Sequence, residues 1–416
     1  MNTVRIGVIG LGQRGYSIAK DVLMNIDHVD ITAGCDVYED RNERLAEVVK
    51  EKRGHGIFTS TDYNEILKRK DVDAVYVATS WDTHVEIAIA ALRAGMPCAM
   101  EVGGAYSIDE LYRLVHAYED TKTPFMMMEN CCFNRDELLA TSMARSGKLG
   151  EIVHCSGAYS HDLRSEVANG NIIRHYRLNN YLKRNTENYP THELGPIAKI
   201  LGINRGNRMV SLVSVASKAA GMEQYIKDHP ELVEKDPTLE GARFAQGDIV
   251  NTIITCAGGQ TIALKLDTTL PRSYSRELTV RGTKGAYFMD TDTVFLDGMK
   301  EYWDPRKFAD DYMRNAKEYE KDYLPSYWTE ITEEQKKTGH GGMDRVMWLE
   351  FTKCLSEGLP FPIDVYDAAA WMAVTALSEQ SVAEGGMPKA IPDFTDGKWL
   401  TRKNCDVLEF PWVKSE

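Results

Sequence analysis

Short apolar segments alternate with amphipathic ones over the first third of the chain. Residues 41–52, 83–95 and 108–120 repeat apolar side chains at intervals of three and four positions, which predicts helices. Between them lie apolar runs that predict buried strands, at residues 4–10, 29–37, 73–79, 97–102 and 124–129. Strands that alternate with helices over this length predict a doubly wound parallel sheet, which is an α/β architecture.

The pattern changes after about residue 150, where strand-like segments follow one another without helices between them. They cover residues 151–160, 208–217, 248–257, 260–269, 275–282 and 293–298. Such a succession predicts a mostly antiparallel open sheet in an α+β domain. The paired glycines within residues 256–260 predict a tight hairpin turn. Residues 344–358 and 366–385 predict two closing helices, and the charged stretch 300–337 predicts a solvated insertion.

Composition and charge limit the classes of partner. The chain has 416 residues and a formal net charge of -13, so it offers no basic face for nucleic acid or for an anionic membrane surface. We therefore expect a small-molecule ligand. We also expect a cytoplasmic protein, because no apolar signal core precedes the first strand and no stretch is apolar for long enough to cross a bilayer.

The eight cysteines are scattered through apolar patterns, and no CxxC spacing occurs. We interpret them as reduced, buried small residues. His154, His161 and Asp162 could suggest a metal site, but strand alternation gives them ordinary positions, and we predict no metal.

The strongest local motif is Gly10-Leu11-Gly12-Gln13-Arg14-Gly15, which follows a strand and opens a helix. Gly10 allows the tight turn, Gly12 lets a pyrophosphate approach the backbone, and Gly15 permits close packing of helix and strand. Asp36 ends the next strand, where a carboxylate binds the adenosine ribose. This combination predicts a Rossmann domain. The Asp36 carboxylate favours NAD, since it would repel the phosphate that distinguishes NADP.

Other polar positions follow the later strands at the edge where open α/β sheets bind ligands. Trp81 and His84 come after one strand, and Glu101 and Val102 end the next. Trp81 could equally pack at the sheet edge, and His84 could cap a helix. We divide the chain into an NAD-binding Rossmann domain over residues 1–128 and an α+β substrate and oligomerisation domain over residues 129–416.

Together these features resemble the Gfo/Idh/MocA oxidoreductases. Ordinary members carry Glu-Lys-Pro where this chain has Glu101-Val102-Gly103, and their lysine assists hydride chemistry. They also place an aspartate four positions before a histidine, where this chain has Asn188 before His192. These departures argue against a plain alcohol dehydrogenase.

A closer resemblance is to the NAD-dependent glycosidases of that superfamily, of the α-N-acetylgalactosaminidase type. It is carried by the strings MENCCF, GAYSHDLR, ENYPTHELGP and GHGGMD. The predicted cofactor residues, from the glycine motif and from the resemblance, are Gly10, Gly12, Arg14, Gly15, Asp36, Trp81, His84, Glu101, Val102, Asn130 and Tyr189. The implied substrate residues are Tyr159, Arg177, Tyr189, Thr191, His192 and, on the weakest match, Tyr274.

The resemblance implies a glycosidase that does not need two flanking carboxylates. In that route a hydride leaves carbon 3 of the sugar for NAD, and the resulting ketone acidifies the proton on carbon 2. Loss of that proton expels the aglycone from carbon 1, water adds, and the hydride returns. Histidine titrates nearest neutral pH, so we assign His192 as the first catalytic base, with Tyr159 and Tyr189 as further catalytic residues. Arg177 would position the sugar, and Glu129 is a weaker acid-base candidate.

Each of these side chains also has a purely structural interpretation, and the proton-transfer roles could be exchanged among them. Two other functions remain open, namely a sugar or cyclitol dehydrogenase that releases NADH and a non-catalytic NAD-binding sensor. An open antiparallel sheet offers a face for self-association, so we expect a homodimer or homotetramer.

Overall fold

The computed structural model describes residues 3–406 and 408–413. These fall into two compact units, which we call the first unit and the second unit. The first unit comprises Met1–Asn134, Glu330–Ala369 and Asn404–Glu409. The second unit comprises Arg135–Thr329, Ala370–Lys403 and Phe410–Glu416. A stretch late in the sequence, Glu330–Ala369, thus clusters with the N-terminal residues.

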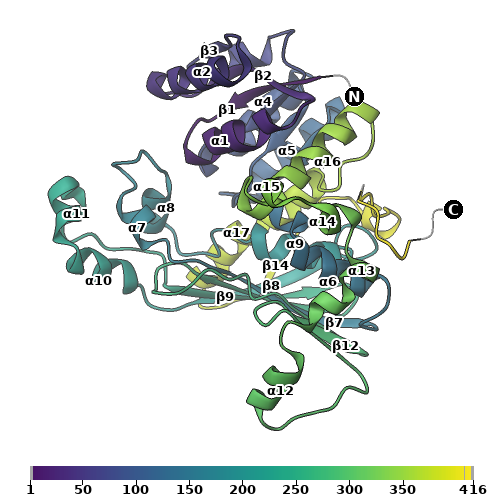
Figure 1. Ribbon diagram of the computed structural model, residues 1–416. Helices are drawn as coiled ribbons and strands as arrows, with labels where there is room; N and C mark the ends of the chain where they lie inside the picture. The colour runs from purple at the N-terminus through teal and green to yellow at the C-terminus, as the bar shows by residue number, and fades with distance from the viewer. Residues whose placement is uncertain (1–2, 407, 414–416) are drawn as a thin grey trace. The chain divides into compact units, whose positions relative to one another are not determined.

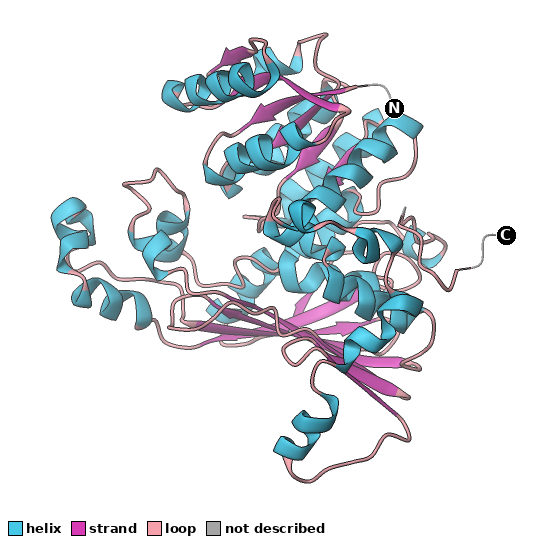
Figure 2. Ribbon diagram, in the orientation of Figure 1, coloured by secondary structure: helices cyan, strands magenta, loops and turns pink. Residues whose placement is uncertain are grey.

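Figures 1 and 2 show the sheet of the first unit, whose strands are mostly buried and apolar except β3. Its strands are β1 (Val4–Ile9), β2 (Val29–Cys35), β3 (Phe58–Ser60), β4 (Ala74–Val77), β5 (Cys98–Met100) and β6 (Phe125–Met127). They lie in the order β3-β2-β1-β4-β5-β6, and every pair is parallel. This is the strand order of a Rossmann sheet, as the sequence predicts.

Helices follow most strands of the first unit. After β1 come α1 (Gln13–Ser17), the π-helical η1 (Ile18–Val22) and η2 (Leu23–Asn25). The others are α2 (Glu39–Arg53), α3 (Tyr63–Leu67), α4 (Trp81–Arg93), α5 (Ile108–Thr121), η3 (Asn130–Phe133), α15 (Glu333–Lys336), η6 (His340–Gly342) and α16 (Met343–Glu357). The Ser107 hydroxyl and the Glu110 carboxylate form a capping box that starts α5. Helix α4 begins two residues earlier than predicted, which places Trp81 and His84 in its first turn.

A broad sheet forms the second unit, with strand order β13-β12-β11-β7-β10-β9-β8-β14 (Figure 2). The strands are β7 (Ile152–Ser160), β8 (Met209–Ala216), β9 (Ile249–Cys256), β10 (Thr261–Asp267), β11 (Thr279–Gly282), β12 (Gly285–Phe288), β13 (Thr293–Leu296) and β14 (Lys389–Ala390). All neighbours pair antiparallel except β7 and β10. The predicted hairpin joins β9 to β10, with Gly259 at φ +87°. The predicted class, an α/β Rossmann sheet plus a mostly antiparallel α+β sheet, is confirmed.

Helix α9 (Thr191–Leu201) covers one face of this sheet and packs against β7, with α6 (Arg135–Arg145) beside it (Figure 1). The approach depends on Gly157 of β7, because a Cβ there would lie 2.9 Å from Cβ of Glu193 and 3.2 Å from Cδ1 of Ile197. Strand β9 alternates buried and exposed positions, so its other face is open to solvent.

Other helices of the second unit are short. They are α7 (Arg164–Ala168), α8 (Arg177–Lys183), α10 (Gly221–Asp228), α11 (Pro230–Lys235), η4 (Pro237–Leu239), α12 (Pro305–Tyr312), η5 (Asn315–Tyr319), α13 (Glu320–Tyr323) and η7 (Lys398–Leu400). The unit boundaries fall within α14 (Ser326–Glu330) and α17 (Val365–Ala383). The predicted insertion at 300–337 is a series of short, mostly exposed helices.

All eight cysteine thiols are free. Seven are buried, as the sequence predicts, whereas Cys405 is half-buried. Among the described residues, none of the helices combines the length and the apolar character needed to span a membrane.

The contact at Gly157 gives a first prediction. Gly157→Ala forces a methyl group against α9, and we expect it to destabilise the chain by about 1–3 kcal/mol, measured as a lower thermal midpoint. The matched control is Gly56→Ala, where an added Cβ meets nothing within 4 Å. Equal midpoints for the two variants would show that α9 does not pack closely on β7.

Candidate active site

The glycine loop after β1 has the shape of a dinucleotide cradle. Gly10 has φ +93°, and a Cβ there would lie 2.5 Å from the carbonyl carbon of Ala78. A Cβ on Gly15 would lie 1.9 Å from the Gly10 oxygen, so this glycine lets α1 begin close to the strand. At Gly12 the only neighbour of an added Cβ would be Nη1 of Arg41, at 3.7 Å. The loop is therefore closely packed at Gly10 and Gly15 and more open at Gly12, which fits a pyrophosphate.

Asp36 stands directly after β2 and is held beside this loop. Its Oδ2 accepts a hydrogen bond from the Leu11 amide at 2.7 Å, and its Oδ1 accepts one from the Tyr38 amide at 3.0 Å. The Arg41 guanidinium lies 3.4 Å from Oδ2. A buried carboxylate fixed at the end of the second strand fits the ribose of an adenosine group.

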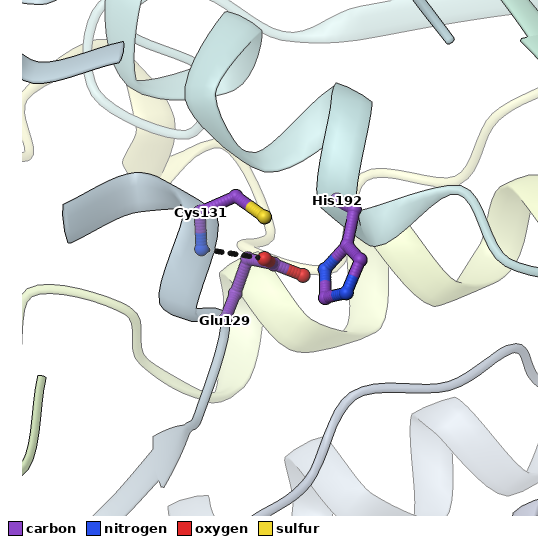
Figure 3. Close-up of side chains that lie close together, drawn as sticks. All are labelled: Glu129, Cys131 and His192. Atoms are coloured by element: carbon purple, nitrogen blue, oxygen red, sulfur yellow. Dashed lines mark hydrogen bonds between the residues drawn. The ribbon is translucent and has the colours of Figure 1, made fainter. Parts of the chain in front are cut away.

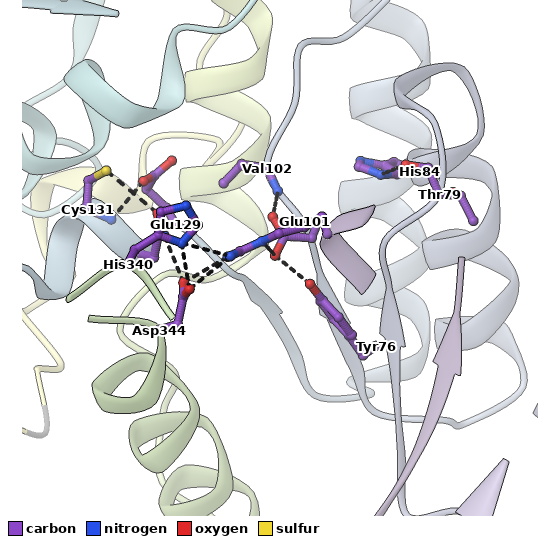
Figure 4. Close-up of polar contacts among 11 residues, drawn as sticks. Tyr76, Thr79, His84, Glu101, Val102, Glu129, Cys131, His340 and Asp344 are labelled. Atoms are coloured by element: carbon purple, nitrogen blue, oxygen red, sulfur yellow. Dashed lines mark hydrogen bonds and ion pairs between the residues drawn. The ribbon is translucent and has the colours of Figure 1, made fainter. Parts of the chain in front are cut away.

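An ion network surrounds the guanidinium of Arg14, a residue of the glycine motif. Figure 4 shows its members Tyr76, Glu101, His340 and Asp344. Arg14 Nε donates to Oε1 of Glu101 at 2.9 Å. Its two Nη atoms donate to the two carboxylate oxygens of Asp344, each at 2.9 Å. Tyr76 donates to the same Glu101 oxygen at 2.6 Å, and the Val102 amide donates to the other oxygen at 3.2 Å. Glu101 is thereby fixed at the end of β5.

Asp344 is a fully buried member of this network. Asn130 Nδ2 donates to its Oδ1 at 2.8 Å, and Nδ1 of His340 lies 2.7 Å from its Oδ2. Burial alone would raise the pKa of Asp344, but Arg14 and the His340 hydrogen bond outweigh it and hold that pKa well below its usual range. Asp344 is therefore ionised, and Arg14 is matched by two carboxylates.

His84 lies apart from this network, beside Thr79 (Figure 4). Its Nε2 is 2.7 Å from the Thr79 carbonyl oxygen, which makes Nε2 the donor. Its Nδ1 is buried without a hydrogen-bond partner among the described residues. Burial lowers the pKa of His84, so the ring is neutral and Nδ1 offers a lone pair. Trp81 packs against Gly103, where an added Cβ would lie 2.6 Å from the indole.

Glu129 follows β6 and is fully buried. Its Oε1 accepts a hydrogen bond from the Cys131 amide at 3.0 Å (Figure 3), which makes Glu129 the N-cap of η3. This capping helps to fix Asn130, the next residue. Glu129, the weaker acid-base candidate, therefore also has a structural role as the N-cap of η3.

In the second unit, the three residues predicted to be catalytic lie together. Tyr159 is near the end of β7, Tyr189 precedes α9, and His192 is in the first turn of α9. The ring centroids of Tyr159 and Tyr189 are 4.7 Å apart, those of Tyr189 and His192 are 4.8 Å apart, and those of Tyr159 and His192 are 5.5 Å apart. We call these three residues the aromatic cluster.

Arg177, the first residue of α8, adds a positive charge to the aromatic cluster. Its guanidinium carbon lies 5.2 Å from the centroid of the Tyr189 ring, and its Nε is 3.3 Å from Oε1 of Glu166. Burial raises the pKa of Tyr159 to about 12, although Arg177 partly offsets this. Tyr159 is therefore a protonated hydrogen-bond donor at neutral pH.

Two further aromatic residues border the cluster. Tyr274, with 45% of its surface exposed, lies 6.4 Å from Tyr159 between ring centroids. Nδ1 of His161 is 3.3 Å from the Tyr159 hydroxyl, and burial lowers the pKa of His161. The sequence predicts an ordinary strand position for His161, but β7 ends at Ser160 and His161 follows it. Strand alternation does not reveal its contact with Tyr159. The Thr191 hydroxyl is also buried, and no described residue is its partner.

The segment that leads to Tyr189 is anchored by buried hydrogen bonds within the second unit. The Thr186 hydroxyl donates to the Thr375 carbonyl oxygen at 2.6 Å, and the Glu187 amide donates to the Ser378 hydroxyl at 2.9 Å, both on α17. Asn188 stands where ordinary Gfo/Idh/MocA members are expected to carry an aspartate. Its Nδ2 donates to Oε1 of Gln246 at 3.0 Å. The motif therefore enters α9 from a fixed backbone.

Comparisons with known proteins identify the class of each part. Residues 4–129 match the family model of the oxidoreductase family with an NAD-binding Rossmann fold. A levoglucosan dehydrogenase solved with NADH and levoglucosan has a TM-score of 0.69 at 17% identity, covering 94% of this chain and 100% of that one. Myo-inositol 2-dehydrogenase from Lactobacillus plantarum has a TM-score of 0.65 at 15% identity, with the same coverage. The fold is that of the Gfo/Idh/MocA oxidoreductases, and the cofactor is NAD.

Residues 133–401 match the C-terminal domain of glycosyl hydrolase 109. A glycosyl hydrolase family 109 protein from Solibacter usitatus is 37% identical over 408 residues, 96% of this chain and 90% of that protein. An α-N-acetylgalactosaminidase from Shewanella oneidensis is 36% identical over 419 residues, 98% and 88% of the two chains. One from Tannerella forsythia is 34% identical over 435 residues, 97% and 89%. The chain belongs to glycosyl hydrolase family 109.

The Arg14 network predicts the effect of removing one charge. Asp344→Asn keeps the shape of the side chain but leaves Arg14 with one carboxylate, and we expect a loss of about 2 kcal/mol in the free energy of unfolding. Denaturant unfolding followed by tryptophan fluorescence measures it. Asp109→Asn, on an exposed position of α5, is the matched control. An unchanged midpoint for Asp344→Asn would contradict the network.

Glu187 predicts a pH dependence. Burial raises the pKa of this carboxyl to about 8, and the neighbouring Tyr189 amide and Glu193 carboxyl only partly offset it. Above its ordinary value of 4.5 the unfolded chain releases the proton while the folded one keeps it, so stability falls as the pH rises toward 8.

Glu187→Gln mimics the protonated acid and removes this pH-dependent cost. The thermal midpoint of the variant relative to the wild type should therefore be higher at pH 8 than at pH 5. The exposed Glu231→Gln serves as the control and should show no such trend. If the thermal midpoints of Glu187→Gln and the wild type differ by the same amount at pH 5 and pH 8, Glu187 is not held protonated.

Proposed function

We propose that this chain hydrolyses α-N-acetylgalactosaminides or related glycosides by a redox-neutral, NAD-dependent route. Its relatives from Shewanella oneidensis and Tannerella forsythia carry the name α-N-acetylgalactosaminidase, which supports this substrate class. The predicted site residues, including Tyr189 as a contact of both cofactor and sugar, are part of the proposal.

The observation that carries the proposal is the aromatic cluster with Arg177 beside it. A sugar ring presents hydroxyl groups at its rim and C–H bonds on its faces. Tyrosine and histidine rings pack against such faces, and their polar atoms reach the hydroxyls. The cluster supplies one histidine and two phenols in contact with one another, and Arg177 adds a guanidinium beside the Tyr189 ring. This set can move protons on a sugar without a pair of flanking carboxylates.

The chemistry that NAD supplies when bound is the reversible storage of the hydride from carbon 3. The imidazole of His192 takes the proton of the carbon 3 hydroxyl as that carbon is oxidised, and it returns the proton when the hydroxyl is restored. The Tyr159 hydroxyl, kept protonated by burial, donates to the oxygen that becomes negative when carbon 2 loses its proton. Tyr189 contacts both rings, and its hydroxyl takes up the carbon 2 proton while it passes its own proton to the departing aglycone oxygen. Water then adds at carbon 1 and the reverse relay returns a proton to carbon 2, while the planar fork of Arg177 orients the sugar.

The glycine loop and Asp36 fit NAD and would hold its pyrophosphate and its adenosine ribose. Gly12 gives the pyrophosphate access to the backbone, and the Asp36 carboxylate binds the ribose hydroxyls. No lysine follows Glu101, whose carboxylate is instead bound by Arg14, Tyr76 and the Val102 amide. Val102 therefore stands where ordinary dehydrogenases of this fold carry the lysine that assists hydride chemistry near the nicotinamide.

We also propose that the chain assembles as a homodimer or homotetramer and acts in the cytoplasm. The open face of the second unit's sheet exposes Val215 and Ile253, each to about half, which supports an interface. The eight free thiols support a reducing compartment.

A screen of nitrophenyl glycosides tests the function directly. We expect release of nitrophenol from the α-N-acetylgalactosaminide without accumulation of NADH absorbance, and uptake of deuterium at carbon 2 in deuterated water. Net NADH formation from the sugar would show a dehydrogenase instead. Absence of any turnover together with normal binding of sugar and NAD would favour a sensor.

The aromatic cluster is tested by Tyr159→Phe, which keeps the ring and removes the donor. We expect kcat/KM to fall by about 10²- to 10⁴-fold with the thermal midpoint preserved. Tyr225→Phe is the matched control, because this tyrosine packs on Arg164 and His229, outside the cluster. Equal rates for the two variants would remove Tyr159 from the mechanism.

A further inference from the structure

Arg41 lies beside the carboxylate that fits the adenosine ribose. It lies in the first turn of α2, and its side chain turns back to Asp36, with Nη1 3.4 Å from Oδ2. The same Nη1 would be 3.7 Å from a Cβ on Gly12. Its guanidinium carbon lies 4.8 Å from the centroid of the Tyr38 ring. Only 14% of the side chain is exposed, so the cation lies between the glycine loop and the ribose carboxylate.

Rossmann domains distinguish their two dinucleotides by the residue at this point. A carboxylate binds the free ribose hydroxyls of NAD, whereas an arginine nearby accepts the 2′-phosphate of NADP. Both groups are present here, and they form an ion pair with each other. The 2′-phosphate of NADP would be repelled by the Asp36 carboxylate. The same phosphate would be attracted by the Arg41 guanidinium next to it.

Asp36 is held by the backbone of two neighbouring segments. Its oxygens accept hydrogen bonds from the backbone amides of Leu11 and Tyr38, at 2.7 and 3.0 Å. The neighbouring Arg44 is engaged elsewhere, because its Nη2 donates to the Leu11 carbonyl oxygen at 3.1 Å and its guanidinium stacks on Tyr16 at 3.8 Å. Of these two arginines, Arg41 is the one that pairs with the Asp36 carboxylate.

We propose that Arg41 is a latent phosphate-binding residue, and that the Asp36–Arg41 pair sets the preference for NAD over NADP. Asp36 acts twice, since it binds the ribose hydroxyls and also neutralises the guanidinium that would otherwise receive a 2′-phosphate. Loss of the carboxylate removes the repulsive charge beside the 2′-phosphate and leaves the positive charge of Arg41 no longer neutralised by Asp36. The inference concerns dinucleotide binding alone, so it holds or fails independently of the glycosidase activity.

Bound nucleotide is the direct readout. Wild-type protein and variants are incubated with equal concentrations of NAD and NADP, freed of unbound nucleotide by gel filtration and denatured, and the released dinucleotides are quantified by chromatography. We expect wild-type protein to retain NAD. Asp36→Asn should shift the ratio toward NADP on the order of 100-fold, because one repulsion is lost and one charge-assisted hydrogen bond is gained.

The double variant Asp36→Asn/Arg41→Ala separates the two effects. It should lose at least about tenfold of the NADP gained by the single variant, since the phosphate then has no guanidinium. Lys50→Ala, at an exposed position of the same helix, should leave every ratio unchanged. If the double variant keeps the full gain, or if folded Asp36→Asn keeps the wild-type ratio, the proposal is overturned.

A second measurement avoids any change at Asp36, whose hydrogen bonds also hold the loop. Binding of adenosine 2′,5′-bisphosphate and of adenosine 5′-monophosphate is compared by competition with NAD, in wild-type protein and in Arg41→Ala. Arg41→Ala should weaken the bisphosphate by at least about tenfold relative to the monophosphate. An unchanged ratio of the two affinities would show that the guanidinium does not serve the 2′-phosphate.

Discussion

The ion network around Arg14 is the constraint on which the first unit depends. Moving a guanidinium and two carboxylates out of water is unfavourable unless their charges and hydrogen bonds are matched. Here each nitrogen of Arg14 that faces a carboxylate has an acceptor at 2.9 Å, and the two carboxylates have further donors in Tyr76 and Asn130. The network brings together the glycine loop, the end of β5, the turn after β6 and the start of α16.

The second unit holds the polar rings of the aromatic cluster close together in a fixed arrangement. Tyr159 comes from a strand, while Tyr189 and His192 come from a turn and a helix start. Their proximity depends on Gly157, because the absence of a side chain there lets α9 approach β7 two residues before Tyr159. Positions with no chemistry of their own therefore determine whether the reactive groups can act together.

The sequence reveals those features that depend on local spacing. The glycine motif, Asp36 and the alternation of strands and helices each follow from short-range rules, and the structure agrees with them. The grouping of Tyr159, Tyr189 and His192 was accessible only through the resemblance of their strings to a family, since they lie on separate elements. The matches to glycosyl hydrolase family 109 confirm that resemblance.

Contacts between charged or polar side chains of different elements could not be predicted from the sequence. The string that contains His340 and Asp344 predicts a turn before a helix, and nothing in it indicates that the carboxylate is buried against Arg14. The same holds for His161 beside Tyr159 and for Arg41 on Asp36, since an arginine five positions after an aspartate can point in any direction. Charge complementarity in the interior is set by packing, and spacing along the chain does not encode it.

The pairing of Arg14 with a residue 330 positions later also bears on how the protein is made. A ribosome delivers the glycine loop first and Asp344 only after most of the chain has emerged. Until then the guanidinium lacks one of its two carboxylates, and the N-terminal sheet is without the α16 segment that clusters with it. Completion of the nucleotide-binding unit is thus deferred until nearly the whole polypeptide exists, so that unfinished chains lack part of the unit that binds NAD.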